Sequence, residues 1–179
     1  SASSSCPTSA SYNSELKQRP QDIEKAKALL AEAGMPDGFE TTLHLPPPSD
    51  ARRGGEIVAA PLAEDGIKAE IINVEWAQWL ESVFKGKDFG LTIISHTEPM
   101  DIGIYGNEEY YFQYGDADFK AIMADLANAT DPEKRTELMQ AAQRKIADDY
   151  VNAYLFQLAR TGVANAKLKG LWPNAPTQA

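Results

Sequence analysis

The chain has 179 residues, of which 43% are hydrophobic and 24% charged, and this suits one compact domain with a core of its own. Lys and Arg total 17 against 26 Asp and Glu, so the net charge is −9. Such a charge argues against the basic face that nucleic-acid binding requires and disfavours docking on anionic lipid. No apolar run approaches the roughly 20 residues of a membrane-spanning helix.

The first residues differ in character from the rest. Residues 1–20 are polar and without periodicity, which predicts an extended arm ahead of an α/β domain over residues 21–179. The single cysteine, Cys6, excludes an internal disulfide and a zinc site built on cysteines. Because the chain starts without an initiator Met or a signal-peptide pattern, we expect a fragment of a longer protein.

The first predicted elements are a helix over 22–33 and a strand over 39–45. Asp22 is placed to cap the helix, and Gly34 to end it in the left-handed conformation. Prolines at 46–48 end the strand, since they donate no amide hydrogen to a ladder.

A second helix is predicted over 53–65, with a kink or break near Pro61. The apolar residues expected to form its core side are Ile57, Val58 and Leu62. The strand that follows, over 67–74, is apolar on both faces, which predicts a central, covered strand.

A third helix from Trp76 to Gly86 and a strand over 89–95 complete the order strand, helix, strand, helix, strand. Short connections between these elements predict βαβ units, and therefore an α/β fold with a parallel βαβαβ sheet flanked by helices. Residues 96–115 follow as a long loop, which is functional or disordered in a compact domain.

The last third of the chain is predicted to be mostly helical. One helix contains Phe119 and Leu126, and the next opens at Asp131-Pro132, with the aspartate as cap and the proline at the first helical position. Strands are then expected over 151–158 and 162–166.

Candidate ligand-binding residues follow the third predicted strand. In open α/β sheets, ligands bind beyond the carboxyl ends of parallel strands, and the richest of these ends here is 95–101. It offers His96, Thr97, Glu98 and Asp101, whose carboxylates suit a ligand ammonium group. The alternative is that both acids are solvated loop residues, which is the commoner environment of acids.

The other polar and aromatic candidates each have two interpretations. Trp76 and Trp79 have helical spacing, so at least one is expected in the core, while Trp76 could edge a pocket. Arg52 begins a helix, where a cation gains nothing from the dipole, so it suits a ligand carboxylate, a salt bridge or solvent. The long loop carries four tyrosines that either form a recognition surface or cover the core: Tyr105, Tyr110, Tyr111 and Tyr114.

No motif for a metal, a cofactor or covalent catalysis is present. His96 with Glu98 is half of a metal site at most, and His44 lies on a different strand. A P-loop, a dinucleotide fingerprint and a G-x-S-x-G elbow are all missing, so we expect no cofactor. An enzyme using Glu98 and Asp101 as an acid–base pair is the alternative to a binding module, and an assembly domain without a solute is a third class.

Several stretches resemble one known family. The sequence DIEKAKALLAEAGMPDGF over residues 22–39 is similar to a signature of the family 5 extracellular solute-binding proteins, the dipeptide, oligopeptide and nickel receptors of ABC importers. Further pieces agree in order and spacing over about residues 12–173: Arg52-Arg53, Leu62 to Ile67, Val74-Glu75-Trp76, Lys85 to Phe89, Asp131 to Arg135, Gln143, Ile146 to Asp149 and Lys169-Gly170.

The resemblance implies a periplasmic-binding-protein-like (type II) C-terminal lobe, with the N-terminal lobe of the same chain missing. It also implies a periplasmic or extracytoplasmic receptor, lipid-anchored or free, that closes on a peptide or other small solute and delivers it to a membrane permease. In peptide receptors of this family, an aspartate after the third strand holds the ligand's amino terminus. Glu98 stands near its place, and His96 stands where a tryptophan is usual.

Overall fold

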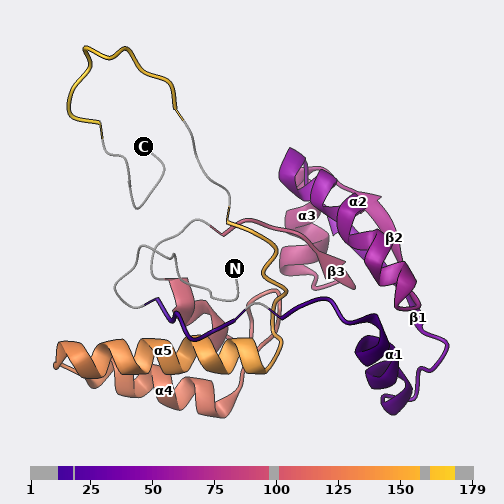
Figure 1. Cartoon of the computed structure of the whole chain (residues 1–179), viewed down its shortest axis with the longest axis horizontal. Helices are drawn as coiled ribbons and strands as arrows, with labels where there is room; N and C mark the ends of the chain where they lie inside the picture. The colour runs from indigo at the N-terminus through magenta and orange to yellow at the C-terminus, as the bar shows by residue number, and fades with distance from the viewer. Residues whose placement is uncertain (1–11, 18, 97–100, 158–161, 172–179) are drawn as a thin grey trace. The chain divides into compact units, whose positions relative to one another are not determined.

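The structure is a computed structural model that describes residues 12–17, 19–96, 101–157 and 162–171. The chain divides into two units, which Figure 1 shows together. We call Pro20–His96 the sheet unit, and Ser1–Arg19 with Thr97–Ala179 the helical unit. Within the described ranges, no helix has both the length and the apolar composition to cross a bilayer.

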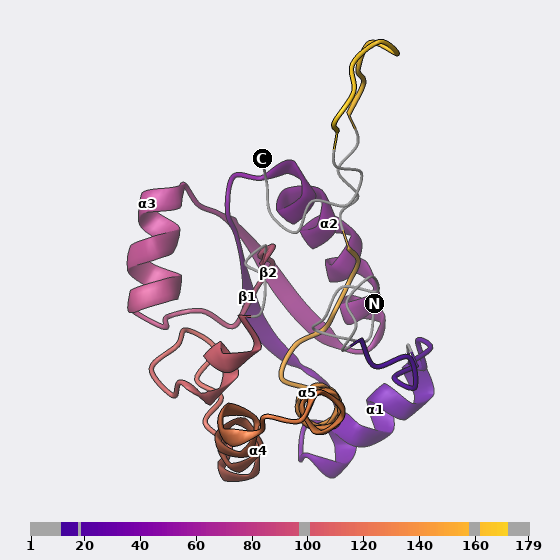
Figure 2. The ribbon, with the colours of Figure 1, turned by 90° about the vertical axis from the view of Figure 1, so that its left-hand side faces the viewer.

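The sheet unit is built on three parallel strands in the order β2-β1-β3: β1 (Phe39–Leu45), β2 (Ile67–Asn73) and β3 (Leu91–Thr92). Helix α2 (Ser49–Glu64) connects β1 to β2, and α3 (Trp76–Trp79) with the π-helical η1 (Leu80–Lys85) connects β2 to β3. Figure 2 shows α2 and α3 on opposite sides of the strands. The predicted parallel βαβαβ order is therefore confirmed.

The central strand is β1, and the prediction that the strand over 67–74 is central was wrong. Leu43 and Leu45 of β1 are buried, whereas β2 pairs with one neighbour and alternates between half-buried and exposed residues. The two apolar faces of β2 did not reveal its place, because an edge strand covered by helices has the same composition as a central one.

The third strand is shorter than the predicted 89–95. It pairs with β1 at Leu43↔Leu91 and His44↔Thr92, one residue before β1 ends at Leu45. The prolines at 46–48 stop β1, as predicted, and so leave β3 without a partner beyond this point.

Helix α1 (Ile23–Glu32) confirms its predicted bounds and its cap. The Asp22 carboxylate accepts a hydrogen bond from the amide of Lys25 at 2.9 Å. Gly34, just beyond the helix, has a φ of 82°, the left-handed value expected of a C-terminal glycine.

Helix α2 differs from its prediction in three respects. It starts at Ser49 rather than at residue 53, and it continues through Pro61 to Glu64 without a break. Ile57, expected on the core side, is 73% exposed, while Ala51 and Gly55 are buried. A Cβ atom on Gly55 would lie 2.3 Å from Cδ1 of Leu45, so the helix rests on the sheet through its small residues.

The helical unit contains η2 (Asp101–Gly106), α4 (Ala117–Asn128) and α5 (Pro132–Asp148). Both long helices were predicted, and α5 has the expected cap at Asp131 and Pro132 at its start. The core of the unit consists of Ile102, Tyr105, Phe119, Ala142 and Ile146. Arg135 of α5 donates to the carbonyl oxygens of Leu126 and Ala129, at 3.0 and 2.9 Å, and so satisfies the end of α4.

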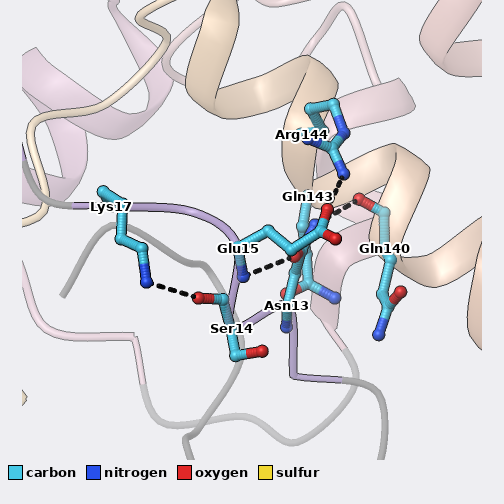
Figure 3. A network of polar contacts seen from close by, with 7 residues as sticks. All are labelled: Asn13, Ser14, Glu15, Lys17, Gln140, Gln143 and Arg144. Atoms are coloured by element: carbon cyan, nitrogen blue, oxygen red, sulfur yellow. Dashed lines mark hydrogen bonds and ion pairs between the residues drawn. The ribbon is translucent and has the colours of Figure 1, made fainter.

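The described part of the N-terminal arm packs along α5 (Figure 3). The backbone amide of Asn13 donates to Oε1 of Gln143 at 3.2 Å, and its side-chain amide donates to the carbonyl of Gln140 at 3.3 Å. Asn13 and Gln143 are each 1% exposed. Glu15 forms an ion pair with Arg144 at 2.7 Å, so the contact combines buried amides with an exposed charge pair.

The strands predicted over 151–158 and 162–166 were wrong for the residues described, 151–157 and 162–166. A strand requires a neighbour that completes its backbone hydrogen bonds. The described part of the helical unit contains no strand, so an apolar pattern alone does not produce one there. Leu158 lies outside the described residues.

Candidate functional site

The carboxyl edge of the sheet carries an exposed ion pair between Arg52 and Glu75. Arg52 lies in the first turns of α2, just after β1, and Glu75 follows β2 as the N-cap of α3. Nη2 of Arg52 lies 3.2 Å from Oε1 of Glu75, and the two side chains are 40% and 80% exposed. The amide of Val74 donates to the carbonyl of Leu45 at 3.0 Å, which holds these two strand ends together. Of the three environments predicted for Arg52, the structure shows the salt bridge.

Trp76 directly follows Glu75 in the sequence and is the first residue of α3. Trp79 is 4% exposed, and its indole N–H donates to the Thr92 hydroxyl at 3.0 Å; this hydroxyl in turn donates to the His44 carbonyl at 2.7 Å. Trp76 is 44% exposed and packs edge-on against Trp79 with ring centroids 5.8 Å apart. One tryptophan is therefore in the core, as predicted, and the other presents its ring to solvent next to Glu75.

The remaining predicted ligand-binding residues fall elsewhere. His96 is exposed at the end of the sheet unit, whereas Thr97 and Glu98 lie outside the described residues. Asp101 starts η2, and its side chain is also outside the described part. Tyr105 belongs to the helical unit. Of the predicted set, Arg52 and Trp76 lie in the same unit and follow the ends of neighbouring strands; Arg52 pairs with Glu75, and Trp76 is the next residue in the sequence.

Two of the four loop tyrosines, Tyr105 and Tyr114, belong to the core of the helical unit or pack against it. Tyr105 and Tyr111 are 6% and 5% exposed. The Tyr105 hydroxyl lies 3.1 Å from that of Tyr154 and accepts a hydrogen bond from Asn152 at 2.5 Å. These contacts favour the core interpretation for both buried tyrosines, and a ligand contact of Tyr105 stays a prediction.

A charged cluster joins the start of α4 to the end of α5. Nζ of Lys145 lies 2.5 Å from Asp149 and 3.1 Å from Asp116, and the Tyr114 hydroxyl donates to Asp149 at 2.5 Å. The Lys145 ammonium, followed by Tyr114, lowers the pKa of Asp149. The amide of Phe119 is the main cause of the lowered pKa of Asp116, and burial is the main cause of the raised pKa of Tyr114.

This cluster predicts a loss of stability in acid. Because the pKa values of Asp116 and Asp149 are lowered in the folded chain, their stabilisation is complete above the usual carboxyl value of 3.8 and is lost as the pH falls below it. In thermal melts followed by circular dichroism, the Tm should fall below about pH 4, and more gently in Asp149→Asn. Asp125→Asn, on an exposed position of α4, is the control. Equal pH dependence in the wild type and Asp149→Asn would contradict the prediction.

No metal site forms in the part of the chain that the structure describes, since no three His, Cys, Asp or Glu side chains are grouped to hold an ion.

The pairing of Glu75 with Arg52 is not among the predictions made from the sequence. The signal for Glu75 in the sequence is its place, two residues after the end of the parallel strand β2 and directly before a tryptophan.

Known proteins similar to this chain are binding proteins. Heme-binding protein A of Haemophilus influenzae is 31% identical over 152 residues, which is 76% of this chain and 28% of that protein. Di/tripeptide-binding protein 1 of Pseudomonas aeruginosa is 30% identical over 151 residues, with the same shares. The chain therefore spans less than a third of the length of these relatives.

Solved structures give the same fold. HbpA2 from Haemophilus parasuis matches 79% of this chain and 31% of its own, with a TM-score of 0.70 and 29% identity. The periplasmic binding protein DppA from Helicobacter pylori, solved with the peptide STSA, matches 82% of this chain and 31% of its own, with a TM-score of 0.72 and 24% identity. The α/β fold is thus that of periplasmic peptide-binding proteins. Residues 1–117 match the family described as "Bacterial extracellular solute-binding proteins, family 5 Middle". The chain belongs to the family 5 bacterial extracellular solute-binding proteins.

Proposed function

We propose that the chain is the C-terminal lobe of a receptor that captures a peptide-like solute and delivers it to the membrane permease of an ABC importer. The observation that carries this proposal is the family match over residues 1–117, joined by relatives named for binding heme, dipeptides, di/tripeptides and glutathione. Capture is by closure of this lobe and an N-terminal lobe on the solute, without covalent chemistry. The receptor works outside the cytoplasm, as a periplasmic or lipid-anchored protein.

The exposed edge of the sheet unit supports a solute with a carboxylate. Peptides, glutathione and heme all carry carboxylate groups, and the guanidinium of Arg52 suits such a group through paired N–H donors. Trp76 of the same unit adds an exposed aromatic ring. Both residues follow ends of parallel strands, where ligands of open α/β sheets bind.

We infer that the protein is not an enzyme, because its named relatives are binding proteins. A structure of the full-length protein with its co-purified ligand separates a receptor from an enzyme and from an assembly domain. An intact solute supports the proposal, whereas a turned-over product or no solute contradicts it. Tight binding of a small molecule by these 179 residues alone would contradict lobe closure.

Glu98 is predicted to receive the ligand's ammonium group, with Asp101 as the second candidate. In a calorimetric titration of the full-length protein with a dipeptide, Glu98→Gln should weaken binding more than about tenfold, because the ammonium loses a charged acceptor. Glu137→Gln, an exposed acid of α5, is the control for the loss of one charge. An unchanged dissociation constant in Glu98→Gln would rule out this role.

A further inference from the structure

The side chain of Glu75 pairs with Arg52 and not with the helix that it precedes. Glu75 is the N-cap of α3, a position where the short side chains of Asp, Asn, Ser and Thr ordinarily accept hydrogen bonds from the amides of the following turn. Here the side chain makes no such bond, and its Oε1 lies 3.2 Å from Nη2 of Arg52 instead. The carboxylate is thus committed to the guanidinium rather than to the helix.

The guanidinium of Arg52 has more N–H donors than Glu75 uses. It has five N–H donors in a planar fork, and Glu75 faces one terminal nitrogen. Nε of Arg52 is buried and has no hydrogen-bond partner among the described residues. Because Nε is buried, a solute carboxylate that binds with both oxygens has to use the two terminal nitrogens, and it therefore competes with Glu75 for Nη2.

A solute carboxylate can readily displace Glu75 from Arg52, because this ion pair is exposed. Exposed ion pairs shift an equilibrium by no more than about fivefold and are screened by salt. Nothing else among the described residues holds the Glu75 side chain, which is 80% exposed. Glu75 can leave Arg52 without disturbing the sheet.

We propose that Glu75 is a built-in competitor of the solute's carboxylate for Arg52, a positioning residue that sets the receptor's affinity. The inference rests on the proposed function, since it requires a solute that carries a carboxylate. When Glu75 is bound to Arg52, the charge of the arginine is already neutralised for a solute without a free carboxylate. A solute with a free carboxylate has to compete with Glu75 for Arg52. The residue thereby tunes discrimination between carboxylate and neutral solutes.

The sheet unit offers a matched control. Glu40 of β1 and Lys68 of β2 are paired in the register and form an exposed ion pair of 2.7 Å, with side chains 76% and 78% exposed. This pair lies near the amino ends of the strands, whereas Arg52 and Glu75 follow the carboxyl ends. Glu40→Gln and Glu75→Gln change the net charge equally and each break one surface pair.

The test is a calorimetric titration of the full-length protein with alanyl-phenylalanine and with its C-terminal amide. Glu75→Gln should bind the free dipeptide about two- to fivefold more tightly than the wild type, with binding of the amide unchanged. Glu40→Gln should match the wild type with both peptides. In an Arg52→Gln background, Glu75→Gln should have no effect on the free dipeptide.

If the wild-type protein binds the free dipeptide but Glu75→Gln does not bind it more tightly, the competitor role is overturned and the proposed function stands. The same follows if Glu75→Gln binds the amide with an equal gain in affinity, or if Glu40→Gln shows an equal gain in affinity for the free dipeptide. Weaker binding of the free dipeptide in Glu75→Gln also overturns it, because Glu75 would then assist Arg52. If the wild-type protein binds neither peptide, the peptide-like solute of the proposed function fails, and the competitor role fails with it.

Discussion

Replacing Phe119 by alanine is expected to lower the free energy of unfolding by about 3–5 kcal/mol. Phe119 is 0% exposed and lies in the core of the helical unit, where its ring packs against Tyr105 and Tyr114 at centroid distances of 6.2 and 5.8 Å. The truncation removes these contacts and leaves a cavity between η2 and α4. Urea unfolding followed by far-ultraviolet circular dichroism measures the loss.

Phe156→Ala is the matched control for Phe119→Ala. Phe156 lies in the same unit and is 54% exposed, so the same truncation should change the free energy of unfolding by less than about 0.5 kcal/mol. Similar losses in the two variants would contradict the position of Phe119 in the core.

Gly38→Ala is expected to destabilise the sheet unit by about 2 kcal/mol or more. Gly38 has a φ of 78°, and a Cβ atom there would lie 1.8 Å from the carbonyl oxygen of Gly66. Both the torsion and the contact therefore require glycine at the turn that leads into β1. In a Trp172→Phe background, Trp76 and Trp79 of this unit are the tryptophans that remain, so thermal melting followed by tryptophan fluorescence reports on this unit.

Gly34→Ala separates the two causes of this effect. Gly34 has a φ of 82°, close to that of Gly38, but a Cβ atom there meets nothing within 4 Å. This variant should lose about 1 kcal/mol from the torsion alone. An equal loss in Gly34→Ala and Gly38→Ala would show that the approach of Gly66 to Gly38 has no energetic weight.

The candidate site was only partly accessible from the sequence. Arg52 and Trp76 could be singled out, because each lies near the start of a helix that follows a predicted strand, and this position follows from local pattern. The pairing of Arg52 with Glu75 could not, because it depends on β1 and β2 being hydrogen-bonded neighbours. The partners are 23 positions apart in the sequence, and no local signal indicates their contact.

The elements whose signals are local could be predicted from the sequence alone. Asp22 and Asp131 cap helices with hydrogen bonds to amides three residues on, and the prolines at 46–48 end β1 because they lack amide donors. The order of alternating strands and helices then specified parallel βαβ units.

Features that depend on partners distant in the sequence could be seen only in the tertiary structure. The central place of β1, the brevity of β3 and the missing strands over 151–157 all depend on which backbone is present to complete each ladder. Burial of Gly55 in place of Ile57 likewise depends on how closely α2 approaches Leu45. Local rules fix torsions and caps, whereas pairing and packing depend on contacts that no short stretch of sequence contains.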